Sequence, residues 1–192
     1  MFAVTHKSVA RMLERSLVAA SLAIGLALVM APAAKAGEII PSLGWTKAPD
    51  GNGDAAIQYG IALRGGLVPM VAGEIGLGYR KSEVFNGQVE STQWPVTASV
   101  WLKPTPMFYL GGGVGWYNTT LHYPNTPALA SYTSQKTGMH LGGGMSLPLV
   151  PGIASADLNL RYVYLGTEKS QLPPQNFKAD YFTAALGCAI HF

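Results

Sequence analysis

Charged residues are scarce in this chain of 192 residues, because Asp, Glu, Lys and Arg together make up only 12% of it. A soluble domain has about 25% charged residues, so a water-facing surface built from this composition would be short of charge. Hydrophobic residues make up 48% of the chain, which excludes the poorly hydrophobic class of disordered proteins. Something other than water must therefore cover an apolar surface, and lipid is one candidate.

The chain also has little cysteine and no metal-ligand pattern. Cys188 is the only cysteine, so no disulfide can form within the chain. The histidines, which are His6, His122, His140 and His191, show no spacing typical of metal ligands. We therefore expect no metal site and no cofactor.

The formal net charge of +3 comes from the amino-terminal end. Residues 1–36 hold four basic residues and one acidic residue, which leaves nine of each sign in residues 37–192. A neutral body has no basic surface for nucleic acid, so we expect no nucleic-acid partner.

Residues 1–36 have the layout of a secretory signal peptide. Three basic residues come first, an apolar run covers residues 16–30, and the segment ends in the sequence Ala-Lys-Ala36. This layout predicts export and cleavage after Ala36, because the apolar run is short for a spanning helix of about 20 residues. The mature domain is then expected to be residues 37–192.

No second long apolar run follows. Residues 104–135 contain no Asp, Glu, Lys or Arg, but prolines and glycines interrupt them, so they do not predict a spanning helix. A chain without a spanning helix can cross a membrane only as a closed barrel, in which every backbone N–H and C=O group is paired.

The mature part alternates with period two between apolar and small or polar residues, which is typical of β-strands. In residues 55–64, for example, Ile57, Tyr59 and Ile61 lie on one face, and Gln58 and Arg64 lie on the other. The pattern predicts eight strands, at residues 39–47, 55–64, 71–80, 94–103, 108–117, 138–147, 155–164 and 181–192.

The connections alternate between short ones rich in Pro or Gly and mostly longer polar ones, which is the layout of an outer-membrane barrel. The short turns are expected at residues 65–69, 103–106 and 148–152. The loops are expected at residues 48–54, 84–90, 118–134 and 166–177.

The apolar face is expected to point outward into lipid. The opposite face is mostly Gly, Ala, Ser and Thr, which suits a narrow lumen where large side chains do not fit. Aromatic residues also fall near both ends of the strands, as in the aromatic belts of membrane barrels. Those near the loops are Trp45, Tyr59, Tyr79, Trp94, Trp116, Tyr164 and Phe182, and those near the turns are Phe108 and Phe192.

Two glycine clusters, Gly111-Gly-Gly-Val-Gly-Trp116 and Gly142-Gly-Gly-Met145, and a last segment that ends in Phe192 complete the pattern. With the signal peptide and the eight alternating segments, they resemble the OmpA-like/OmpX-like outer-membrane β-barrels, a small porin-family or surface-antigen type. The resemblance implies an all-β fold, an eight-stranded antiparallel transmembrane barrel in the bacterial outer membrane. It also implies a signal for the barrel-assembly machinery, carried by Tyr181, Phe182, Leu186, Ile190 and Phe192.

Six charged residues fall on the inward face, and we expect them to form an ion-pair cluster across the lumen. Charges buried without a partner are costly, so pairing is the default. The cluster is interpreted as a structural plug, because eight strands leave little more than side-chain room; the alternative is a gate on a narrow ion path. The six are Arg64, Glu74, Arg80, Lys103, Asp157 and Arg161.

The longest expected loop supplies candidates for surface recognition, which are Leu121, His122, Tyr123 and Tyr132. They could contact a host surface, a phage or another envelope protein, or they could pack over the barrel mouth. The sequence therefore predicts a structural or surface-interaction role in the envelope, with a narrow porin-like channel as the alternative.

An enzyme that modifies lipid A is the less favoured alternative. A deacylase of that kind would need a His-x-Ser pair and a nearby acid. None of His122, His140 and His191 is followed by a serine two residues later. We therefore expect no catalytic residues.

Overall fold

The computed structural model describes residues 37–49, 55–84, 89–122, 132–169 and 176–192. The signal peptide expected over residues 1–36 lies outside them. Within the described ranges, no helix is long and apolar enough to cross a membrane.

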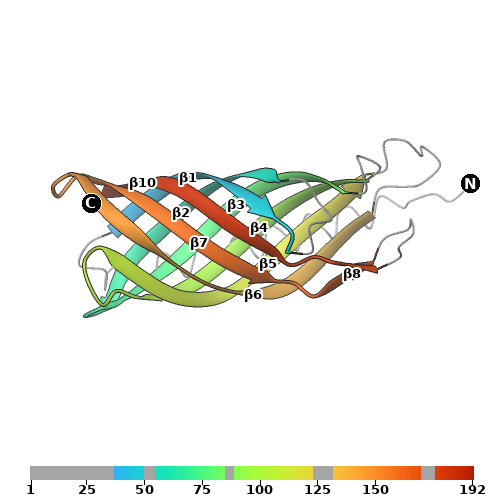
Figure 1. Cartoon of the computed structure of the whole chain (residues 1–192). Coiled ribbons are helices and arrows are strands. Elements are labelled where there is room, and N and C mark those ends of the chain that lie inside the picture. The colour runs from blue at the N-terminus through green and yellow to red at the C-terminus, as the bar shows by residue number, and fades with distance from the viewer. Residues whose placement is uncertain (1–36, 50–54, 85–88, 123–131, 170–175) are drawn as a thin grey trace, which may run out of the picture. The chain divides into compact units, whose positions relative to one another are not determined.

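Eight antiparallel strands of the described chain close into a barrel (Figure 1), in the order β1-β10-β7-β6-β5-β4-β3-β2. This confirms the predicted all-β, eight-stranded antiparallel architecture. The barrel strands are β1 (Gly37–Lys47), β2 (Ala56–Val68), β3 (Val71–Val84), β4 (Val89–Leu102), β5 (Phe108–His122), β6 (Tyr132–Val150), β7 (Ala154–Tyr164) and β10 (Tyr181–His191). The strands β8 (Thr167–Lys169) and β9 (Asn176–Lys178) pair separately as a short hairpin.

The barrel is closed by pairing between β1 and β10. The backbones of Gly37 and Phe192 exchange two hydrogen bonds, each 2.9 Å long. The ladder is interrupted only around Pro41, between the pairs Ile39–Ile190 and Ser42–Gly187. Proline has no N–H group to donate, which accounts for the gap.

The two faces of the wall have the polarity that the alternation predicts. Large apolar side chains such as Ile57, Leu141 and Leu160 are exposed on the outside of the barrel, whereas the lumen side carries buried polar and aromatic groups such as Arg64 and Trp101. Because side chains alternate across a strand, one sequence pattern determines both surfaces.

Short turns connect the strands at one end of the barrel, where the carboxyl terminus also lies (left in Figure 1). These turns are residues 69–70, 103–107 and 151–153. The other end carries the β8–β9 hairpin. We call these the turn end and the loop end.

Several strands extend further than the sequence pattern predicted. The expected loop over residues 118–134 is wrong in extent, because β5 continues to His122 and β6 begins at Tyr132. The polar threonines of this segment continue the ladder, and the side chains of Thr120 and Thr133 hydrogen-bond across it at 3.2 Å. Threonine favours strands although it is polar, so the end of hydrophobic alternation did not mark the end of the strands.

Other expected connections also change, and the turn expected over residues 148–152 becomes residues 151–153. The turn expected over residues 65–69 shrinks to residues 69–70, and the loop expected over residues 84–90 shrinks to residues 85–88. The loop expected over residues 166–177 contains β8 and the start of β9.

Two glycines of the wall provide a matched test of how closely the strands pack. A Cβ atom on Gly113 would collide with the backbone carbonyl oxygen of Ala98 on β4, whereas a Cβ atom on Gly66 would meet nothing within 4 Å. We expect Gly113→Ala to lower the free energy of unfolding by about 1–3 kcal/mol, the usual cost of overpacking. Gly66→Ala should cause no loss. Urea unfolding of both refolded variants checks this, and equal stability of the two would contradict it.

Candidate functional site

The centre of the lumen on the turn side holds a buried ion-pair cluster organised by Arg64. This residue lies directly across from Glu74 in the β2–β3 register. Its guanidinium group approaches the Glu74 carboxylate at 2.8 Å and the Asp157 carboxylate of β7 at 2.8 Å. All three side chains are buried, so the two carboxylates share one cation from opposite sides of the lumen.

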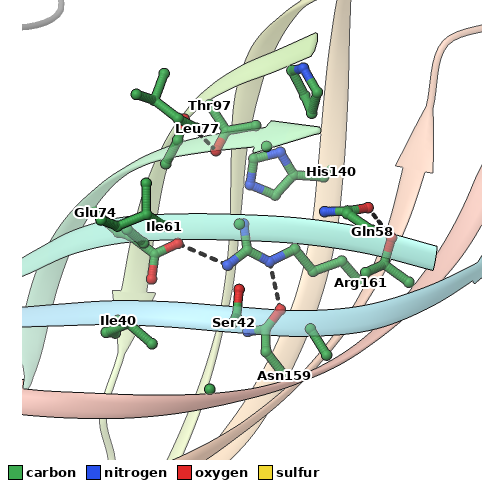
Figure 2. A pocket seen from close by; sticks show the side chains of 18 of the residues that line it. Ile40, Ser42, Gln58, Ile61, Glu74, Leu77, Thr97, His140, Asn159 and Arg161 are labelled. Carbon is green, nitrogen blue, oxygen red and sulfur yellow. Dashed lines mark hydrogen bonds and ion pairs between the residues drawn. The ribbon is translucent and has the colours of Figure 1, made fainter. Parts of the chain in front are cut away.

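A second guanidinium group, from Arg161 of β7, extends this cluster. Its Nη2 atom lies 2.7 Å from Glu74 Oε1, and its Nε donates to the Asn159 side-chain oxygen. Figure 2 shows Arg161 reaching between Glu74 and Asn159. Glu74 therefore accepts from two arginines and uses both carboxylate oxygens.

Aromatic rings complete the cluster. The Tyr109 hydroxyl donates to Asp157 at 2.7 Å and accepts from Asn159 at 3.0 Å. The Arg64 guanidinium carbon lies 4.4 Å from the Tyr109 ring centroid, and Arg161 lies 5.0 Å from that of the fully buried Trp101. These contacts are within cation–π range, so most of the polar atoms of the cluster have partners.

Closer to the turn end, Glu38 of β1 links Lys103 to the cluster. Glu38 lies 3.2 Å from Lys103 Nζ and 3.5 Å from Arg64 Nη1. Five of the six predicted lumen charges are therefore joined in one network, with Glu38 as a member that the sequence reasoning missed. Glu38 was missed because the expected first strand began at residue 39. It pairs with Arg64 in the β1–β2 register and so belongs to the inward face.

Arg80 is the predicted member that the structure places elsewhere. It lies opposite Gln58 in the β2–β3 ladder, six residues towards the loop end from Glu74. Its guanidinium carbon is 3.9 Å from the Tyr181 ring centroid. Among the residues that the structure describes, no carboxylate pairs with it, so its assignment to the ion-pair cluster is wrong.

A polar cavity of about 80 Å³ lies in the lumen on the loop side of the ion-pair cluster. Its wall on β2 and β3 is formed by small residues, among them Gly60, Gly76 and Gly78. Its polar lining includes Gln58, Thr97, His140 and Arg161 (Figure 2). The cavity exists because no large side chain projects from this part of the wall.

Two Ser–His pairs in the lumen have the residue types of hydrolase chemistry. Ser99 lies 2.9 Å from His140 Nε2, and Ser155 lies 2.6 Å from His191 Nε2. The acid nearest to His191 is Glu38 at 3.8 Å, which is too far for a hydrogen bond, and Glu38 already pairs with Lys103. Ser155 is itself buried. His140 Nδ1 has no hydrogen-bond partner among the described residues, so neither pair has the geometry of a working triad.

The residues expected to form the barrel-assembly signal lie on β10 and at Phe192. Phe182, Leu186 and Ile190 are exposed on the outer face, and Phe192 is exposed beyond the strand, whereas Tyr181 is buried in the lumen. The recognition of this segment remains a prediction.

Three of the four loop interaction candidates lie on barrel strands, and the fourth lies outside the described residues. Leu121 lies on β5 and is only 1% exposed, so its assignment as an exposed loop residue is wrong. His122 is exposed at the end of the same strand, and Tyr132 begins β6. Tyr123 lies outside the described residues.

Solved structures of outer-membrane barrels have the same fold as this chain. Neisserial surface protein A superposes with a TM-score of 0.58 at 12% identity, covering 82% of this chain and 96% of that chain. The outer membrane protein OprG from Pseudomonas aeruginosa gives 0.57 at 15% identity, with 83% and 97% covered. Ail, the attachment invasion locus protein of Yersinia pestis, gives 0.50 at 16% identity, with 82% and 98% covered.

No family model matches the sequence, and no curated protein matches it. At these low identities the likeness is one of fold. The architecture of residues 37–192 is that of the small eight-stranded outer-membrane barrels, as the resemblance in the sequence predicts.

Proposed function

We propose that this protein is exported through its signal peptide and resides in the outer membrane as an integral barrel. The apolar outer surface supports this location, because large hydrophobic side chains project outward from every barrel strand described. Aromatic residues also lie near both ends, and two pairs, Tyr79–Trp94 and Tyr162–Phe182, pack at centroid distances of 4.6 and 4.8 Å. Aromatic side chains favour the membrane–water interface.

Its role in that membrane is structural or surface-interactive. The observation that carries this proposal is the ion-pair cluster of Arg64, Glu74, Asp157 and Arg161, which fills the lumen as a plug. Paired charges and aromatic rings block the turn side of the lumen, so the protein acts through its outer face and its loop end. The names of Neisserial surface protein A and of Ail, the attachment invasion locus protein, refer to the cell surface and to attachment, which supports recognition at the loop end.

The proposed location and role imply which partners the protein has. Outer-membrane lipid surrounds the barrel, the barrel-assembly machinery inserts it, and a host surface, a phage or another envelope protein binds at the loop end. The protein has no catalytic role in this proposal.

A narrow channel is the second candidate, favoured by the polar cavity beside the plug. Rearrangement of Arg64 or Arg161 would connect this cavity to the turn end. The two candidates differ in whether the native protein conducts ions.

The lipid-facing surface can be tested by placing an arginine at two depths along the barrel. Leu160 lies near the middle of β7 and is 55% exposed, whereas Leu149 lies at the turn end of β6. In lipid vesicles, Leu160→Arg should lower the free energy of unfolding by about 2–4 kcal/mol, and Leu149→Arg by at most about 1 kcal/mol. Urea titrations of the refolded variants measure both values. A larger loss for Leu149→Arg would place the membrane elsewhere on the barrel.

The plug should stabilise the barrel through its central cation. Arg64→Met leaves Glu74 with one partner and removes the ion pair of Asp157, so the free energy of unfolding should fall by about 3–5 kcal/mol. Lys81→Gln is the control, because it removes an exposed ion pair of the same distance, 2.8 Å to Glu90. We expect that control to unfold like the native protein. If Arg64→Met proved equally stable, the ion-pair cluster would have no stabilising role.

Ion conductance in planar bilayers separates the plug from the channel. The refolded native protein should give no steady channels, whereas the double variant Glu74→Gln/Asp157→Asn should conduct, because neutral side chains of the same size no longer hold Arg64 and Arg161. Glu90→Gln, on the exposed pair, should stay silent. Steady channels in the native protein would favour the narrow-channel role.

A further inference from the structure

The loop side of the lumen contains polar atoms that have no partner in the protein. Four of the buried side-chain atoms without a hydrogen bond among the described residues lie in this part of the barrel: Arg80 Nε, Gln93 Oε1, the Tyr117 hydroxyl and His140 Nδ1. Tyr117 is only 1% exposed. Buried polar groups are nearly always hydrogen-bonded, so a group of unpartnered ones indicates a missing partner.

Two of these atoms belong to residues that line the cavity, and Arg80 lies next to it. Tyr117 and His140 line it, together with Arg161 and Tyr181. Arg80 stacks on the ring of Tyr181, at 3.9 Å. Arg161 and two tyrosines therefore line the loop-side part of the cavity, and Arg80 lies against the ring of one of them.

The charges of the lumen do not balance there. The ion-pair cluster accounts for Arg64, Arg161 and Lys103 with the three carboxylates Glu38, Glu74 and Asp157. Arg80 remains as a fourth cation, and within the described chain its partners are the Tyr181 ring and Thr46, whose hydroxyl is 3.5 Å from Nη1. A cation in a low-dielectric lumen without a counter-ion is costly.

Three of the four unpartnered atoms are donors, and the exception is the acceptor Gln93 Oε1, across from Arg80 in the β3–β4 register. Arg80 Nε is a donor, the Tyr117 hydroxyl can donate, and His140 Nδ1 carries a proton when Nε2 accepts from Ser99. A surplus of donors beside an unbalanced cation fits an acceptor that carries a negative charge. Water would satisfy the donors but would leave the charge of Arg80 uncompensated.

From these observations we propose that the loop-side lumen binds a small inorganic anion of the halide class, between Arg80, Tyr117 and the cavity. A cavity of about 80 Å³ accepts several water-sized species, so a halide with some of its water fits. The ion-pair cluster closes the turn side, so the anion enters from the loop end. The site is independent of whether the lumen conducts.

Halide-dependent stability of the full refolded protein tests this site. The urea midpoint is measured in detergent micelles while sodium gluconate is replaced by sodium chloride at constant ionic strength. The native protein should show a rise in midpoint that saturates with chloride. Crystals soaked in sodium bromide should show an anomalous peak beside Arg80 and Tyr117.

Single substitutions test where in the lumen chloride acts. Arg80→Gln should abolish the chloride dependence and the bromide peak. Tyr117→Phe, which removes only a hydroxyl, should weaken the apparent affinity by about tenfold or more, since hydrogen bonds to charged groups are stronger than neutral ones. Lys81→Gln, an exposed cation one residue further along β3, should behave like the native protein. If Arg80→Gln failed to fold, Tyr117→Phe would carry the test.

Two results would overturn the proposal. One is a native midpoint that does not respond to chloride at constant ionic strength, which would mean that water or the chain itself completes the site. The other is a chloride response that persists in both Arg80→Gln and Tyr117→Phe, which would place the anion elsewhere.

Discussion

The pairing of β1 with β10 is the constraint on which the rest of this structure depends. An open sheet would leave two edges of unpaired N–H and C=O groups, which cannot be tolerated in lipid. Closure removes both edges by joining Gly37 to Phe192 through two backbone hydrogen bonds. Closure also turns the inward faces of all eight strands towards one another, so that charges from β1, β2, β3 and β7 meet in one lumen.

Small residues in the wall determine how that lumen is filled. The ring of Tyr109 packs where Gly144 has no side chain, and the ring of Tyr117 packs against Gly115 and Gly138. A Cβ atom at any of these glycines would meet the tyrosine. The large buried aromatic residues and the glycines of the neighbouring strands are therefore complementary parts of one packing arrangement, since interiors tolerate little extra volume.

The filled lumen has two electrostatically different parts. On the turn side, each of the three carboxylates has a cation, and the network rigidifies the barrel because its members are mutually satisfied. On the loop side, Arg80 and the Tyr117 hydroxyl have no acidic partner among the described residues, beside a cavity formed by glycines. The first part supports a structural role, and the second forms a polar chamber facing the loop end, where surface recognition is proposed.

The period-two pattern of the sequence was enough to predict the number of barrel strands and the orientation of their faces, although not the β8–β9 hairpin. A period of two assigns Ile57 and Arg64 to opposite sides of one strand whatever the partner strands are. Only the tertiary structure decided which inward residues meet. Arg64 and Asp157 are separated by 93 positions, and Arg80 lies three inward-facing positions along β3 from Glu74, an acid that it was expected to reach. Contacts across a closed barrel depend on strand register and stagger, which a local alternation of polarity does not encode.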